Sequence, residues 1–340
     1  MKGDHRGKSE VEIRRLNTLR GFAALIVLVS HFSNESGLWG KALGHGAGQF
    51  GVMLFFLLSG FLMTYLYWEK KPTSRNLLSY AVSRAARVVP LYLLVVFFSF
   101  MTPYMYDIKN IQVLISALLF LHGENVLWTI PPEIQFYVLF GLSWSLLWHR
   151  RAMLPLVLSF VFIATFVLHY KSGTRQVFGF PVTFSIVKAS PFFMLGGILG
   201  GLYKHRKYLL AYQSNWYLLS LVFLLMLYPN IFIPLFGFEH AMWQDVGILA
   251  IVGMVFFCIV FLVPDRNSLL ENKAGDFFGK VSYSLYLLHS PVLAFLTYIG
   301  WVKFGVLSLL VFVVVTSFIA WISFNLIEAP SRKAIRAMVA

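Results

Sequence analysis

The 340-residue chain contains a single cysteine, Cys258, which lies within an apolar run. A disulfide needs two cysteines, so the sequence excludes a disulfide framework, and it excludes a cysteine-based metal site for the same reason. We expect no metal in this protein. Charged residues are also scarce, at 12% of the chain, against about 25% in soluble domains. A water-soluble globular enzyme is therefore excluded.

Acidic residues are half as frequent as basic ones, with 14 Asp and Glu against 28 Lys and Arg, which gives a net charge of +14. Such a charge indicates nucleic-acid binding only when it forms a basic face on a folded domain. Here the basic residues occur in short clusters between apolar stretches. Because 59% of the residues are apolar and the mean hydropathy is +0.74, we expect membrane lipids as the partner and no nucleic acid.

Ten apolar runs are long enough to cross a bilayer. A spanning helix needs roughly 20 mostly apolar residues, because about 30 Å of hydrocarbon is crossed at about 1.5 Å per residue. These runs predict an all-α polytopic protein with ten transmembrane helices. They fall near residues 19–35, 50–68, 88–106, 134–149, 152–169, 183–203, 215–235, 244–263, 281–300 and 304–327.

An eleventh apolar piece, at 111–121, is too short to span and predicts a re-entrant or interfacial helix. With the N-terminus inside, most of the basic residues fall in cytoplasmic loops, as the positive-inside rule requires. Letting 111–121 cross the membrane would invert every later loop. We therefore expect both termini to be cytoplasmic.

The chain is predicted to be one membrane domain over residues 1–340. Its first 18 residues are interpreted as a cytoplasmic tail, because the apolar run after them lacks a small-residue cleavage site. Residues 328–340 form a second cytoplasmic tail. No fused extracytoplasmic domain is expected.

Two histidines lie inside predicted spans, where ionisable side chains are costly and mark functional sites. His31 follows Arg20 by eleven residues, or roughly 16 Å along a helix. His289 is expected at a similar depth, so the two rings meet if their helices face each other. An imidazole accepts and returns a proton near neutral pH. The alternative is that each ring only donates a hydrogen bond that stabilises packing.

Arg84 and Arg87 are three residues apart and are predicted to point the same way on a helix. Two guanidiniums can bind a phosphate through paired hydrogen bonds. Together with Arg20 they predict a site for a phosphorylated cytoplasmic ligand. For other basic residues, topology alone explains the position.

The stretch Leu127–Tyr137 combines a Pro-Pro pair, a carboxylate, an amide and aromatic rings at the predicted outer mouth of the fourth span. Its aromatic residues can belong to the interfacial belt. Glu133, however, is a carboxylate where the helix enters apolar surroundings. The stretch is therefore predicted to hold a polar acceptor.

Taken together, these segments resemble the membrane acyltransferase type 3 family, whose members O-acylate bacterial surface glycans. The order and spacing of the motifs carry the resemblance, since no single motif decides it. They are Arg14–Ala24 with His31, Phe55–Phe61, the pair Arg84 and Arg87, Leu127–Tyr137, Ser282–His289 and Ile327–Pro330.

The resemblance implies an O-acyltransferase of the bacterial inner membrane. It would move an acetyl or other short acyl group from cytoplasmic acyl-CoA to a hydroxyl of a lipid-linked or extracytoplasmic saccharide, such as O-antigen or exopolysaccharide. Arg20, Arg84 and Arg87 would bind acetyl-CoA. His31 would act as general base or acyl carrier, and Glu133 would orient or activate the acceptor. The remaining candidates, for substrate binding or for an oxyanion hole, are Ser59, Trp128, Gln135, Tyr137, Tyr283, Ser284 and His289.

A transporter or flippase for a lipid-linked sugar is the alternative, because it would also have many spans, buried polar residues and glycine-rich helices. Broken helices in paired repeats are typical of transporters, and the sequence has no such repeat. The glycines at 196–201 are most simply a close-packing surface. Neither the acceptor nor the length of the acyl group follows from the sequence.

Overall fold

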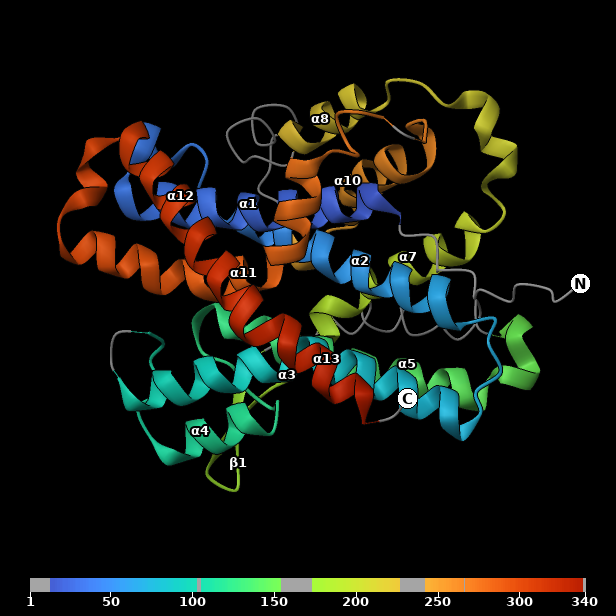
Figure 1. Ribbon diagram of the computed structural model, residues 1–340, viewed down its shortest axis with the longest axis horizontal. Coiled ribbons are helices and arrows are strands. Elements are labelled where there is room, and N and C mark those ends of the chain that lie inside the picture. The colour runs from blue at the N-terminus through green and yellow to red at the C-terminus, as the bar shows by residue number, and fades with distance from the viewer. Residues whose placement is uncertain (1–12, 103–104, 154–172, 227–241, 266, 339–340) are drawn as a thin grey trace, which may run out of the picture.

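The computed structural model describes residues 13–102, 105–153, 173–226, 242–265 and 267–338 (Figure 1). Within these ranges the chain is helical except for loops and one antiparallel hairpin, in which β1 (Thr174–Val177) pairs with β2 (Phe180–Thr183). The predicted helical class is therefore confirmed for the described residues.

The described ranges contain the following helices and shorter helical segments. The α-helices are α1 (Arg14–Ser36), α2 (Gly48–Tyr67), α3 (Ser74–Met101), α4 (Ile111–Leu118), α5 (Ile130–Leu146), α7 (Ser185–Tyr203), α8 (Tyr217–Met226), α10 (Val246–Phe257), α11 (Lys273–Tyr298), α12 (Val306–Ser323) and α13 (Ala329–Ala337). Six 3₁₀ segments join them: η1 (Leu38–Lys41), η2 (Asn125–Thr129), η3 (Trp148–Met153), η4 (Arg206–Tyr212), η5 (Met242–Gln244) and η7 (Trp301–Phe304). Two π-helical turns, η6 (Cys258–Leu262) and η8 (Phe324–Glu328), extend α10 and α12.

Five helices of the described chain are long and apolar enough to cross a membrane, and a sixth is added if the bent pair η4 and α8 counts as one span. The five are α1, α2, α3, α7 and the continuous helix Val306–Ala337. A multi-pass membrane protein is thus supported, while the total of ten spans stays a prediction. The predicted span at 152–169 lies outside the described residues except for its first two, and the one at 215–235 is described only as far as Met226.

The short apolar piece near 111–121 forms α4, which ends at Leu118. Its eight residues cover only about 12 Å at 1.5 Å per residue, too little to cross the hydrocarbon. The Asn110 side chain caps its N-terminus by accepting the Val113 N–H at 2.9 Å. The helix is held from one side, where the Tyr92 hydroxyl donates to the Ala117 carbonyl at 3.0 Å.

The helix α3 begins earlier than its apolar run predicts. Its first turn is capped by Thr73, whose hydroxyl accepts the Asn76 N–H at 3.2 Å. From there α3 continues without a break through the polar segment before residue 88, where the span was expected to start. Arg84 and Arg87 therefore lie within the helix, near its middle, and not in a loop at its end.

The start of α1 is fixed by a fully buried arginine. The Arg15 guanidinium contacts Asp265 at 2.5 Å and Glu271 at 3.0 Å, and it donates to the Val263 carbonyl at 2.6 Å. A buried cation is stable when it is paired and hydrogen-bonded in this way. Because these partners precede α11, the contacts tie the first turn of α1 to the start of α11.

Glycines allow α2 and α7 to approach closely. A Cβ at Gly196 would collide with the Leu57 carbonyl oxygen, and one at Gly60 would collide with the Phe193 carbonyl oxygen. Small residues at such positions let helix backbones come together in a membrane. The predicted packing role of the glycine cluster is thus confirmed for Gly196. Since α2 carries Ser59 and α7 supports it, this contact positions part of the site described below.

We expect Gly196→Ala to lower the stability of the folded protein by about 1–3 kcal/mol, because the added methyl group has to displace backbone. Gly201→Ala is the matched control, since a Cβ there meets only the Thr64 Cγ2 atom at 3.9 Å. The thermal unfolding temperatures of both variants, purified in the same detergent, measure the effect. Equal unfolding temperatures would contradict the close approach of α2 and α7.

Candidate active site

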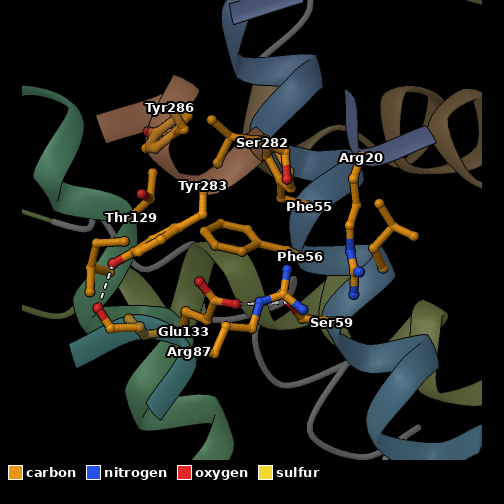
Figure 2. A pocket seen from close by; sticks show the side chains of 14 residues that line it. Arg20, Phe55, Phe56, Ser59, Arg87, Thr129, Glu133, Ser282, Tyr283 and Tyr286 are labelled. Carbon is orange, nitrogen blue, oxygen red and sulfur yellow. Dashed lines mark hydrogen bonds between the residues drawn. The ribbon is translucent and has the colours of Figure 1, made fainter. Parts of the chain in front are cut away.

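A small cavity of about 40 Å³ lies where α1, α2, α3, α5 and α11 meet. Aromatic and aliphatic side chains form most of the wall. The chemistry-bearing side chains gathered around it are shown in Figure 2, and they are Arg20, Ser59, Arg87, Glu133 and Tyr283.

Glu133 lies in the first turn of α5, directly after Pro131 and Pro132. Proline suits the first helical turn, and the helix N-terminus stabilises a carboxylate. Its Oε1 atom accepts hydrogen bonds from the Ser59 hydroxyl at 3.0 Å and the Tyr137 hydroxyl at 2.5 Å. Its Oε2 atom accepts none from the described residues. The carboxylate is thus held in place with one oxygen available to a ligand.

Arg20 and Arg87 reach the cavity from α1 and α3. Neither forms an ion pair with any residue in the described ranges, although both are close enough to repel each other electrostatically. With Glu133 as the one carboxylate of the described lining, the cavity carries a net positive charge, and a buried charge is costly unless it is paired. This excess of positive charge is suited to an anionic group.

Arg84 is nine-tenths buried, but it does not line this cavity. It faces the neighbouring groove between α3 and α5, beside Tyr80, and its Nε–H has no hydrogen-bond partner. Arg84 and Arg87 thus line two different hollows, and their joint binding of one phosphate stays a prediction. Three residues along a helix give a rotation of about 300°, so the two side chains diverge by about 60°.

The cavity also brings together residues that the sequence assigned to opposite membrane faces. Glu133 was expected at the outer mouth of a span and the arginines at the inner face, yet Glu133, Arg20 and Arg87 line the same cavity. Arg87 lies near the middle of the 28-residue helix α3, beside α5, which carries Glu133.

His31 and His289 meet, as their predicted depths suggested. The His31 Nδ1 atom lies 3.0 Å from the His289 Nε2 atom, and the ring centroids are 4.9 Å apart. His289 is fully buried, whereas His31 is partly exposed. Neither ring lines the cavity, but Tyr286 lines it and lies 5.9 Å, centroid to centroid, from His289. The histidine pair is thus one side chain beyond the cavity.

Of the other predicted residues, Ser59 and Tyr283 line the cavity. Ser59 is engaged with Glu133, as described above. The Tyr283 hydroxyl donates to the Val88 carbonyl at 2.8 Å, so its proton is used in linking α11 to α3.

Four predicted residues do not line the cavity. The Ser284 hydroxyl is buried and donates to Glu328, which leaves it no proton for an oxyanion. The Gln135 amide donates to the Phe120 carbonyl at 3.1 Å. The Tyr137 hydroxyl donates a hydrogen bond to the Glu133 Oε1 atom. The Trp128 ring packs against the Trp243 ring at 5.4 Å between centroids. The partners of Ser284 and Trp128 are far apart from them in sequence, and no local pattern indicates those contacts.

Two charged groups near the site were not among the predicted site residues. Glu328 is buried and contacts Arg332 at 2.6 Å. It lies in the π-helical turn η8, through which the helix continues beyond residue 327, where the span was expected to end. Lys188 lies with its Nζ atom 3.8 Å from the centroid of the Trp128 ring. This is a cation–π contact, and the position of Lys188 inside an apolar run was the signal that could have identified it.

A family model described as "Acyltransferase domain" matches residues 13–326. The chain belongs to this acyltransferase family. The family assignment confirms the resemblance stated from the motifs, and the matched region contains the whole cavity and both histidines.

The acyltransferase is also similar to curated relatives named O-acetyltransferase OatA from Staphylococcus aureus, including strains NCTC 8325 / PS 47, COL and MRSA252. The identity is 25% over 357 residues, covering 94% of this chain and 57% of each relative. The chain therefore spans little more than half the length of these relatives. No solved structure matches it.

Proposed function

We propose that this acyltransferase is an integral membrane O-acyltransferase of the bacterial cytoplasmic membrane. It transfers a short acyl group, acetyl in the first instance, from cytoplasmic acyl-CoA to a hydroxyl of a lipid-linked or extracytoplasmic saccharide. The family, the names of the similar proteins and the apolar helices support this proposal. The observation that carries it is one cavity holding two arginines without a described carboxylate partner together with an anchored Glu133.

The arginines of the cavity bind the anionic donor. Arg20 and Arg87 contact its phosphates, and Arg84 adds positive potential from the adjacent groove. The electrostatic repulsion between Arg20 and Arg87 is relieved when an anion lies between them. The thioester end of the donor then extends along α1 toward the histidine pair, past Tyr286.

The transfer needs a base and a positioned hydroxyl. His31 removes the proton from the acceptor hydroxyl while its oxygen attacks the thioester carbonyl carbon. The bond from that carbon to sulfur breaks, the acyl ester forms, and the thiolate takes the proton from the His31 imidazolium to leave as free CoA. Glu133 orients the acceptor through its Oε2 atom, which no described side chain occupies.

Binding of the donor is tested by thermal unfolding in the presence of CoA, since a ligand that binds the folded state stabilises it. At a CoA concentration of 100 times Kd, the stabilisation is about 2.7 kcal/mol. We expect Arg87→Gln to lose this protection. Arg75→Gln is the matched control, because Arg75 is an exposed residue of the same helix. Absence of protection in the unmutated protein would contradict the proposal and favour a flippase for lipid-linked sugars.

The acceptor is identified by mass spectrometry of surface polysaccharide, lipid A and secreted glycolipid from cells with and without this protein. We expect a mass difference of one acyl group per modified sugar in one of these fractions. Identical spectra in all three would contradict a saccharide acceptor.

A further inference from the structure

The hydrogen bonds of His289 are fixed by a group that can only accept. Its Nδ1 atom lies 2.7 Å from the Tyr286 carbonyl oxygen, one turn earlier on α11. A carbonyl oxygen has no proton to donate, so Nδ1 of His289 must carry the hydrogen. In a neutral imidazole the other nitrogen is then an acceptor. Nε2 of His289 therefore presents a lone pair.

That lone pair determines the state of His31. The His289 Nε2 atom and the His31 Nδ1 atom are 3.0 Å apart, and a hydrogen bond between them needs one proton. Since His289 supplies the acceptor, His31 supplies the donor and is protonated on Nδ1. The Nε2 atom of His31 is then unprotonated, and no hydrogen bond within the described chain occupies it.

We propose that His289 is a positioning residue that holds His31 in the Nδ1–H tautomer and so makes Nε2 of His31 the basic atom of the site. This inference rests on the proposed acyl transfer. It also explains why His31 and not His289 is the base: both nitrogens of His289 are already hydrogen-bonded, and the residue is fully buried.

The arrangement needs no rearrangement during the reaction. When Nε2 of His31 takes a proton from the acceptor hydroxyl, the ring becomes an imidazolium whose Nδ1–H still donates to His289. The partially negative Nε2 of His289 stabilises that positive charge, as the buried carboxylate does in a Ser-His-Asp triad. The proton later leaves from the same Nε2 atom to the departing thiolate. His289 itself gains and loses no proton.

The tautomer is measured directly by ¹⁵N NMR of the full-length protein labelled at both histidine ring nitrogens, in lipid nanodiscs. The His31 signals are assigned by their loss in His31→Asn. We expect Nδ1 of His31 to have the chemical shift of a protonated nitrogen and Nε2 that of an unprotonated one. The opposite pattern, with Nε2 protonated, would overturn the proposal whether or not the protein transfers acyl groups.

Kinetics test the consequence of that tautomer. His289→Leu removes the acceptor, and we expect a decrease of about 10- to 100-fold in kcat with little change in the KM for acetyl-CoA, in line with other partners that orient histidines. His289→Gln carries an amide oxygen that can accept from Nδ1 of His31, and it should restore most of the rate. Equal kcat in His289→Leu and the unmutated protein would overturn the positioning role.

A purely structural role for His289 gives a different result. It would lower the unfolding temperatures of His289→Leu and His289→Gln without restoring kcat in the glutamine variant, and that pattern also overturns the proposal. If the unmutated protein transfers no acyl group while its His31 shows the Nδ1–H pattern, the proposed function fails and the tautomer assignment holds.

Discussion

His31→Ala should lower the rate of acyl transfer by about 10²–10⁴-fold, the usual contribution of a general base. The alanine side chain cannot accept the proton of the acceptor hydroxyl, and the loss should appear in kcat. The KM for acetyl-CoA should change little, because His31 lies beyond the cavity that holds Arg20 and Arg87. The measurement is transfer of radiolabelled acetyl from acetyl-CoA to the acceptor in membranes with matched protein levels.

His45→Asn is the control for this prediction, since His45 is exposed in the loop after α1. It should retain the full rate. A His31→Ala protein that inserts normally and still acylates at nearly the unmutated rate would exclude His31 as base and as acyl carrier.

Glu133→Gln should also reduce acyl transfer strongly, by about 10²-fold or more. The amide keeps the volume of the side chain, and it still accepts from Ser59 or Tyr137. It loses the negative charge and the free carboxylate oxygen that we assign to the acceptor. The KM for the acceptor should therefore rise and kcat should fall, while protection by CoA against thermal unfolding is retained.

Two further variants distinguish the effect of the Glu133 carboxylate from that of its hydrogen-bond partner and from that of an exposed carboxylate. Ser59→Ala removes one hydrogen bond to Glu133 at 3.0 Å, typically worth about 0.5–1.5 kcal/mol, so its effect should be roughly tenfold or less. Glu35→Gln changes an exposed carboxylate and should have no effect. If Glu133→Gln and Glu35→Gln transfer acyl groups equally fast, Glu133 has no role in the reaction.

The sequence predicts the helices well where apolar composition alone decides them. The runs at 19–35, 50–68, 183–203 and 304–327 all lie in helices that are long enough to cross a membrane. It predicts the start of α3 poorly, because a helix continues through polar residues when a cap such as Thr73 and the packing of neighbouring helices support it. Counting apolar residues does not detect such a polar beginning.

In the site, too, local sequence predicts some features, while tertiary packing decides the others. Depth along two helices predicted that His31 and His289 lie at a similar level, because helical rise is constant, whereas the facing of their helices, which brings the rings together, is a result of the tertiary fold. The joining of Arg87 and Glu133 was not predictable, since it depends on how α3 and α5 pack and not on either segment alone. The bond from Ser284 to Glu328 likewise joins residues 44 positions apart, and only the tertiary fold brings those two side chains together.

Because α1 is one continuous helix, it fixes the distance between the residues it carries. Arg20 and His31 are eleven residues apart on one continuous helix, which is about three full turns, so both side chains emerge on the same face roughly 16 Å from each other. Neither end can move relative to the other without breaking the helix. In the proposed reaction, the enzyme therefore selects its donor by length, because the thioester carbon has to lie a fixed distance from the phosphates. A truncated thioester bound at Arg20 would not reach His31.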